Sequence, residues 1–195
     1  MTSLPTQVDA FFHIRILVGI ITGLSMSRLL TGLARPVQHP ELKSVGYVHT
    51  AWAIYLLLTI VHFWWFELGL SKVDKWTFGL YLFVIAYGIL LFLICTILFP
   101  DRMDQYSDPE TYFFSRKAWF YGLLAAVCLV DVGDSALKGS AHLRALGLEY
   151  FVRQATMFTL SVIAIFVPKR LYHAAFASAG ILYQVWWALR QFDVF

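Results

Sequence analysis

Six long apolar segments, separated by short polar stretches, limit what this chain can fold into more than any other feature. Each is close to the roughly 20 helical residues needed to cross the ~30 Å hydrocarbon core of a bilayer. The segments occupy residues 11–34, 45–68, 76–99, 118–137, 147–167 and 171–190. They predict an all-α integral membrane protein, a bundle of six transmembrane helices that forms a single membrane domain over residues 1–195.

The composition agrees with this class of protein. Of the 195 residues, 59% are hydrophobic and 14% are charged, whereas a soluble domain has about 45–50% apolar and about 25% charged residues. Aromatic residues make up 17% of the chain, as expected of aromatic belts at membrane interfaces. No basic run interleaved with aromatic residues lies outside the apolar segments, so we predict a lipid bilayer and no nucleic acid as partner.

The six segments divide into two groups of three, which raises the question of an internal repeat. Many transporters consist of two inverted halves. The sequence FFHIR at Phe11–Arg15 resembles FFSRK at Phe113–Lys117, and both open an apolar segment. Two inverted three-helix halves are therefore one arrangement of the bundle, although short matches of this kind also arise by chance between apolar segments.

The location follows from the apolar segments, and the orientation from the basic residues near their ends. Eight lysines and arginines lie on one side of the bilayer and seven on the other, so the positive-inside rule discriminates weakly. We predict a multi-pass protein of a bacterial-type inner (plasma) membrane with both termini outside the cytoplasm. A cleaved signal peptide is not expected, because the first ten residues lack a basic cluster and the first apolar segment contains Arg28.

Two aspartates near the end of the fourth segment are its most unusual feature. Asp131 and Asp134 are three positions apart, so on a helix their carboxyls point in similar directions. At ~1.5 Å per residue, Asp131 lies about 9 Å inside the Leu137 end. Its side chain is too short to reach the headgroups from there, and an ionisable residue at such depth usually faces the protein interior or water.

Three further residues share a bilayer half with this aspartate pair, because successive helices alternate in direction. We predict a transport or ion-coupling site made by Asp131, Asp134, Arg153, Arg15 and His62. Clustered carboxyls that face basic groups relay protons or bind ions in other membrane proteins. The alternative is that long side chains near helix ends, such as Arg15, extend to the headgroups.

A second polar layer is expected in the opposite half of the bilayer and consists of Arg28, His49 and His173. We interpret Arg28 in this layer as a counter-ion or as a contact for an anion, beside the two histidines. The alternative is that its side chain extends to the headgroups. Haem b needs two imidazoles at matching depth on different helices, which His49 and His173 could supply. No metal-binding spacing of histidines or cysteines occurs, so no cofactor is predicted and haem stays an alternative.

Small residues recur every four positions in the first apolar segment. Gly19 and Gly23 form a G-x-x-x-G pattern that Ser27 continues. Such a stripe lets two helix backbones approach closely. We therefore predict that these three residues form a helix-packing surface.

The leading functional hypothesis is a small membrane transporter or channel in which protonation or ion binding at the aspartate pair gates the movement of a small ion or solute. The second is a structural or accessory subunit of a larger membrane complex, or a homo-oligomer, in which the charges only lock helices together. The third is a haem-binding or redox membrane protein. No nucleophile elbow or phosphate-binding loop is present, so an enzyme is not favoured, although hydrolysis by an aspartate pair stays open.

Overall fold

A computed structural model describes residues 7–38, 46–73, 76–100, 106 and 108–192 of the chain. This part is helical and contains no β-strand. The elements are α1 (Gln7–Gln38), α2 (Tyr47–Phe66), the 3₁₀ helix η1 (Glu67–Lys72), α3 (Phe78–Leu98), α4 (Pro109–Leu137), α5 (Ser140–Phe166) and α6 (Arg170–Phe192). The prediction of an all-helical fold is confirmed. The predicted start of the second helix at Val45 lies outside the described residues.

Four of the six α-helices are long and apolar enough to cross a membrane. These stretches are Phe11–Arg35, Tyr47–Ser71, Phe78–Leu98 and Pro109–Leu137. With 27 and 23 residues, α5 and α6 also have the necessary length. Polar residues in their sequences, such as Arg153, Gln154 and Gln184, lower their hydropathy.

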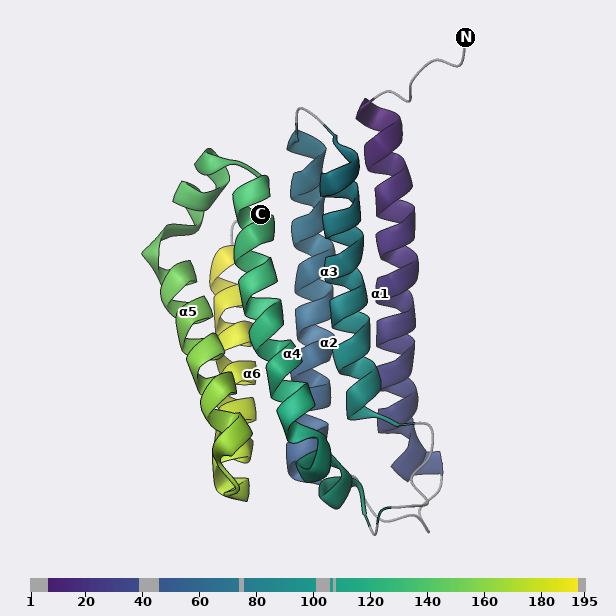
Figure 1. The fold of residues 1–195 in the computed structure, drawn as a ribbon, viewed down its shortest axis with the longest axis vertical. Helices are drawn as coiled ribbons and strands as arrows, with labels where there is room; N and C mark the ends of the chain where they lie inside the picture. Colours follow the sequence, from purple (N-terminus) through teal and green to yellow (C-terminus); the bar gives the residue numbers. More distant parts are fainter. Residues whose placement is uncertain (1–6, 39–45, 74–75, 101–105, 107, 193–195) are drawn as a thin grey trace.

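The helices lie side by side, and successive helices run in opposite directions (Figure 1). Helix α3 packs between α1 and α4, α5 packs along α4, and α6 packs along α2. In this packing, α1 lies closely against α3, whereas the backbones of α4 and α6 do not come within 8 Å of each other in the described residues. The packing thus does not repeat between the first three and the last three helices.

Helix α4 begins earlier than the apolar pattern predicts. The fourth predicted segment begins at residue 118, but the helix starts at Pro109. Asp108 caps it, because its side chain accepts a 2.8 Å hydrogen bond from the Thr111 amide, and proline suits the first helical position. Positions 101–105 and 107 lie outside the described residues.

Helix α5 also begins earlier than the predicted span at residue 147: it starts at Ser140, directly after Gly139. Gly147 separates this first segment from the rest of α5 with φ 69° and ψ −179°, a conformation that favours glycine because it has no Cβ. Figure 1 shows the short segment bent away from the main axis of α5. The predicted start of the fifth span at residue 147 therefore coincides with a bend inside one longer helix.

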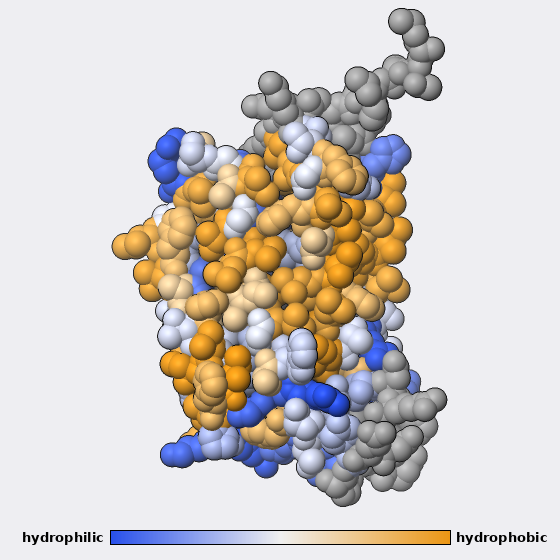
Figure 2. Space-filling model, in the orientation of Figure 1, coloured by the Kyte–Doolittle hydropathy of each residue, from blue (hydrophilic) through white to orange (hydrophobic). Residues whose placement is uncertain are grey.

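The surface of the bundle carries a broad apolar band with polar residues toward both ends (Figure 2). On α1 the exposed large apolar residues are Phe12, Ile16, Ile20, Leu24 and Leu30. On α3 they include Phe78, Leu82, Ile89 and Leu93. Soluble monomers rarely expose contiguous apolar patches larger than a few hundred Å², so this surface suits lipid.

An aromatic cluster fills the bundle interior between α2, α4 and α6, in the half where α2 and α6 begin. Trp52 on α2 lies at its centre, with ring centroids 5.2 Å from Phe120, 5.6 Å from Tyr121 and 5.1 Å from Phe176. All four side chains are buried. The interior of this half is therefore closed by packed rings.

Candidate functional site

A cavity of about 90 Å³ lies in the other half of the bundle interior, between α2, α4, α5 and α6. It is large enough for several water molecules. Its polar lining includes His62, Glu67, Asp131, Asp134, Arg153 and Gln184. Four of the five residues of the predicted ion-coupling site, Asp131, Asp134, Arg153 and His62, are thus brought to one cavity.

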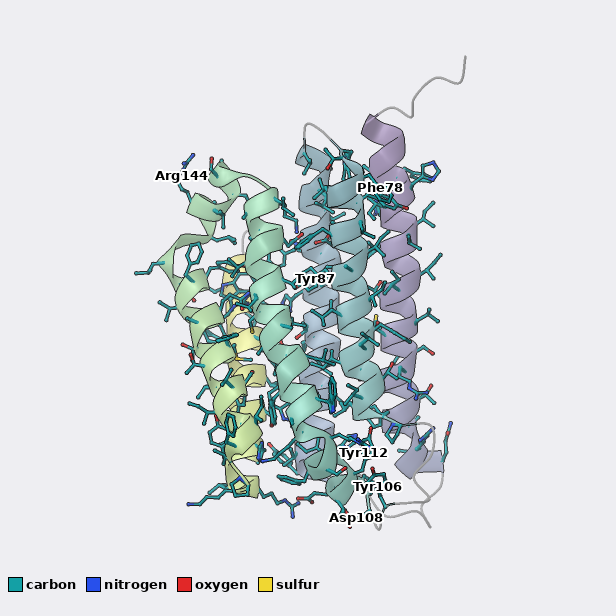
Figure 3. All side chains as sticks on the ribbon, in the orientation of Figure 1. Phe78, Tyr87, Tyr106, Asp108, Tyr112 and Arg144 are labelled. Carbon is teal, nitrogen blue, oxygen red and sulfur yellow. The ribbon has the colours of Figure 1, made fainter. Side chains whose placement is uncertain are left out.

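Asp131 is held by hydrogen bonds from two helices. The hydroxyl of Tyr87 on α3, which is labelled in Figure 3, donates to Oδ1 at 2.9 Å, and the Tyr150 hydroxyl on α5 donates to Oδ2 at 2.7 Å. The Gln154 side-chain amide, one turn after Tyr150, donates to the same Oδ2. These donors fix the carboxyl in one orientation, although 28% of the side chain stays exposed.

Arg153 lies beside this carboxyl without a close ion pair. Its Nη2 is 3.9 Å from Asp131 Oδ2. The guanidinium carbon is 5.6 Å from the centroid of the Tyr150 ring and 5.4 Å from that of Trp187, within the range of cation–π attraction. The two rings and the carboxylate together position the charge at the cavity wall.

A second charged cluster, the triad of Glu67, Asp134 and Lys138, lies at the end of α4. Lys138 Nζ is 2.8 Å from Glu67 Oε1 and 2.5 Å from Asp134 Oδ2. The three side chains are almost fully buried, with exposures of 3%, 7% and 5% for Lys138, Glu67 and Asp134. One ammonium faces two carboxyls, so the triad has a net charge of −1 when both carboxyls are ionised. An uncompensated buried charge is costly.

The protonation state of Lys138 follows from its surroundings. Burial by itself lowers the pKa of Lys138, but Asp134 and Glu67 more than offset this effect and raise it above the ordinary lysine value. The ammonium is therefore protonated at neutral pH. The charge balance of the triad is then decided by its two carboxyls.

His62 reaches the cavity through a hydrogen-bonded neighbour. The Gln184 side-chain nitrogen lies 3.2 Å from His62 Nδ1 and 3.1 Å from Thr59 Oγ1. This contact joins α6 to two successive turns of α2. It places the imidazole on the opposite wall of the cavity from the α4 carboxyls.

Arg15 is the one residue of the predicted site that lies outside the cavity. The buried face of α1 is formed by Ile14 and Val18, and Arg15 points to the exposed side. Its guanidinium lies 5.9 Å from the centroid of the Trp64 ring. Arg15 and Glu67 border a separate depression of about 10 Å³. Arg15 lies at a depth similar to that of the other predicted site residues, but its position around the axis of α1 directs it away from the cavity.

The triad contains two residues that the sequence reasoning did not include. Glu67 and Lys138 both lie where a predicted apolar segment ends, and a long side chain at such a position can extend to the headgroups. The i,i+4 spacing of Asp134 and Lys138 is a signal of pairing that could have been used. No sequence signal brings Glu67, from the end of α2, to the same lysine.

The second polar layer contains a complete hydrogen-bonded chain around His173. Tyr121 Oη lies 2.7 Å from His173 Nδ1 and accepts from Trp52 Nε1 at 3.1 Å, while His173 Nε2 lies 3.0 Å from the Val167 carbonyl. The carbonyl only accepts, so Nε2 carries the proton, and the indole only donates, so the Tyr121 proton is directed to Nδ1. His173 is thus a neutral imidazole with both nitrogens engaged.

His49 and Arg28 are not part of this chain. The His49 ring is buried against Phe99, with centroids 4.7 Å apart. Phe113 packs against both imidazoles, 6.1 Å from His49 and 6.3 Å from His173, so the two rings do not form a pair of axial ligands. Arg28 is half-buried on α1, within electrostatic range of Tyr112. Within the described residues, no group of three or more His, Cys, Asp or Glu side chains is placed to hold a metal ion.

The predicted packing stripe on α1 is only partly used inside the chain. A Cβ at Gly19 would lie 3.2 Å from the Trp64 ring, whereas one at Gly23 would meet no described atom within 4 Å, and Ser27 is exposed. The closest approach to α1 occurs instead at Gly32, where a Cβ would lie 2.3 Å from the Phe99 ring. Gly23 and Ser27 face outward.

Comparison with protein-family models, with curated proteins and with solved structures found no significant match. The function is therefore argued from the geometry of the cavity and its charges.

Proposed function

We propose that this chain is a six-span transporter or channel of a bacterial-type inner membrane, and that proton or ion binding in the cavity controls the passage of a small ion or solute. The observation that carries the proposal is the cavity itself. It gathers Asp131, Asp134 and Arg153 inside a bundle whose outer surface is apolar. Ionisable groups inside a membrane bundle mark ion and substrate pathways more often than they mark packing.

The placement of polar residues on α5 and α6 supports six spans. Arg153, Gln154 and Gln184, which lower the hydropathy of these helices, line the cavity. Their exposed faces carry large apolar residues, among them Leu148, Val152, Val162 and Phe166 on α5 and Leu171, Leu182 and Leu189 on α6. A helix with polar residues inward and apolar residues outward suits a bundle in lipid.

The closure of one half of the interior favours a transporter over an open pore. At its deep end the cavity reaches Tyr55, whose ring centroid is 5.2 Å from that of Trp52 in the aromatic cluster. Passage across the bundle therefore requires the aromatic cluster to move. A site that is closed toward one side of the bundle suits alternating access, in which the two halves of a transporter move around a fixed site.

The proposal is tested by ion flux in liposomes that contain the purified full chain. The chain with both Asp131→Asn and Asp134→Asn is compared with the native chain, and Glu110→Gln is the control, because Glu110 forms an ion pair with Arg170 and neither residue lines the cavity. We expect proton or ion flux in the native and control chains and none in the folded double variant. Undiminished flux in the double variant would refute the proposal.

The outward position of Gly23 and Ser27 favours a second candidate function, that of an accessory subunit or homo-oligomer. Small residues on an exposed helix face allow a second helix to approach closely, and no described residue has an atom within 4 Å of a Cβ at Gly23. A membrane protein that co-purifies at a fixed ratio would support this function. The absence of flux in the native chain together with such a partner would make it the better account.

A further inference from the structure

Three buried oxygen atoms, on side chains of residues that line the cavity, accept no hydrogen bond from any described residue. They are Glu67 Oε2, Asp134 Oδ1 and Gln184 Oε1. Each belongs to a side chain that is more than nine-tenths buried. Among the described residues, every buried hydrogen-bond donor on the cavity wall has an acceptor. The cavity therefore offers acceptors in excess, and buried acceptors are stable only when a donor meets them.

The Gln184 oxygen is assigned by its neighbours. The Thr59 hydroxyl donates its proton to the Tyr55 carbonyl at 2.9 Å, so its oxygen accepts the hydrogen bond from Gln184 Nε2. This contact places the amide nitrogen toward Thr59 and leaves Oε1 as an acceptor. Gln184 lies on α6 and carries no charge, so the third acceptor is independent of the two carboxyls.

The charges that face the cavity select for a single positive charge. Asp131 and Arg153 lie 3.9 Å apart and balance each other. Glu67 and Asp134 share Lys138, so these three side chains carry one negative charge when both carboxyls are ionised. His142 also lies within electrostatic range of Asp134. Arg15 is exposed and lies outside the cavity. A monovalent cation balances the cavity, whereas an anion would add to its negative charge and a divalent cation would exceed it.

The rings around the cavity favour an ammonium group over a bare metal cation. Aromatic side chains of Tyr55, Phe63, Phe66, Tyr87 and Tyr183 line it. Aromatic faces attract ammonium ions, whereas alkali and alkaline-earth cations prefer a shell of oxygen ligands. A primary ammonium has three N–H donors, which equals the number of free acceptors.

We propose that the cavity binds ammonium or a small primary ammonium ion, whose N–H groups donate to Glu67, Asp134 and Gln184. The proposal concerns the cavity of the proposed function and names the class of cation that occupies it. Binding in detergent does not require transport. If binding is found without flux, the proposed function fails and this assignment stands; if proton flux is found without binding, the reverse holds.

The test is thermal unfolding of the purified full chain in detergent, followed by tryptophan fluorescence, with chloride salts at constant ionic strength. Methylammonium and ammonium should raise the unfolding midpoint in a saturable manner. Tetramethylammonium has the same charge and no N–H donor, and it should give no saturable rise, as should sodium and potassium. A saturable rise with tetramethylammonium, sodium or potassium that equals the methylammonium effect would overturn the proposal, and so would no rise with any salt.

Two variants test the ligands separately. Glu67→Gln removes one charge and Gln184→Leu removes the neutral acceptor, and each should weaken apparent methylammonium affinity by roughly tenfold or more, as expected for the loss of a charge-assisted hydrogen bond. Glu110→Gln, in an ion pair with Arg170 outside the cavity, should leave the affinity unchanged. Native affinity in both cavity variants would overturn the assignment. If one of the two cavity variants does not fold, the methylammonium affinity of the other variant tests the assignment.

Discussion

The Lys138 ammonium lies 2.8 Å from Glu67 Oε1, although the two residues are 71 positions apart. This contact joins the end of α4 to η1, directly after α2, and thereby ties together two of the walls of the cavity. Asp134, one turn before Lys138, completes the triad at 2.5 Å. The stability of the cavity end and its charge balance depend on the same three side chains.

Loss of the lysine should therefore destabilise the protein strongly. Lys138→Met leaves two buried carboxyls without their cation, and breaking a buried ion pair from one side costs about 3–5 kcal/mol. The thermal unfolding midpoint in detergent should fall accordingly. The chain that combines Lys138→Met with Glu67→Gln and Asp134→Asn should recover most of the loss. A single variant as stable as the native chain would contradict the role assigned to the triad.

The same triad predicts how stability depends on alkaline pH. The pKa of Lys138 is raised in the folded state, because the attraction of Asp134 and Glu67 exceeds the effect of burial. Its stabilising contribution is therefore complete below the ordinary lysine pKa of about 10.4 and is lost as pH rises through the higher folded value. Unfolding midpoints measured from neutral to alkaline pH should fall more steeply for the native chain than for the uncharged triple variant. Equal slopes would count against the prediction.

The donors on Asp131 should each stabilise the fold. Tyr150→Phe removes a hydrogen bond to a carboxyl oxygen, which is worth about 1.5–3 kcal/mol when one partner is charged. Tyr106→Phe is a suitable control, because the Tyr106 side chain lies outside the membrane-spanning stretches and contacts Arg116 at the surface. Denaturation of the two variants in parallel would test the prediction, which fails if both are equally stable.

Tyr121 should be important for the closed half of the interior. Tyr121→Phe preserves the ring but leaves Trp52 Nε1 and His173 Nδ1 without their shared partner. Each unpaired buried group costs about 1–3 kcal/mol. Thermal unfolding should show this loss, and tryptophan fluorescence should change because Trp52 loses its acceptor. An unchanged midpoint and spectrum would contradict the hydrogen-bonded chain described for His173.

Two glycines of α1 form a matched pair for testing helix packing. Gly32→Ala should destabilise the chain by about 1–3 kcal/mol, as overpacking does, because its Cβ would lie 2.3 Å from the Phe99 ring. Gly23→Ala should be neutral or should stabilise α1 by up to about 1 kcal/mol through helix propensity, since no described atom lies within 4 Å of the new Cβ. Unfolding midpoints distinguish the two. A loss of stability or of oligomers with Gly23→Ala would indicate a partner at this face.

The number and order of the helices could be predicted from the sequence because apolar length is a local property. The start of α4 was missed because the cap of Asp108 and Pro109 stands in a polar stretch that the apolar pattern does not cover. The helical segment before Gly147 was missed for the same reason. Local capping chemistry, rather than hydropathy, decides both boundaries.

The candidate site was predicted in part because depth along a helix follows from residue counting, whereas direction around the helix depends on packing. Asp131, Asp134, Arg153 and His62 share a depth and also share the cavity. Arg15 has a matching depth but points to the exposed side of α1. Glu67 could not be assigned to the triad, because its approach to Lys138 exists only once α2 and α4 are packed in the bundle.

The claim that ions are coupled in this cavity can be tested most directly through Cys128, a free cysteine on the cavity wall. Flux is measured in liposomes before and after treatment with methyl methanethiosulfonate, in a chain with Cys95→Ser so that Cys128 is the only thiol. Mass spectrometry confirms the modification. Flux should fall on modification and should persist when Cys128→Ser is also present. Full flux through a chain in which Cys128 is modified would contradict the account.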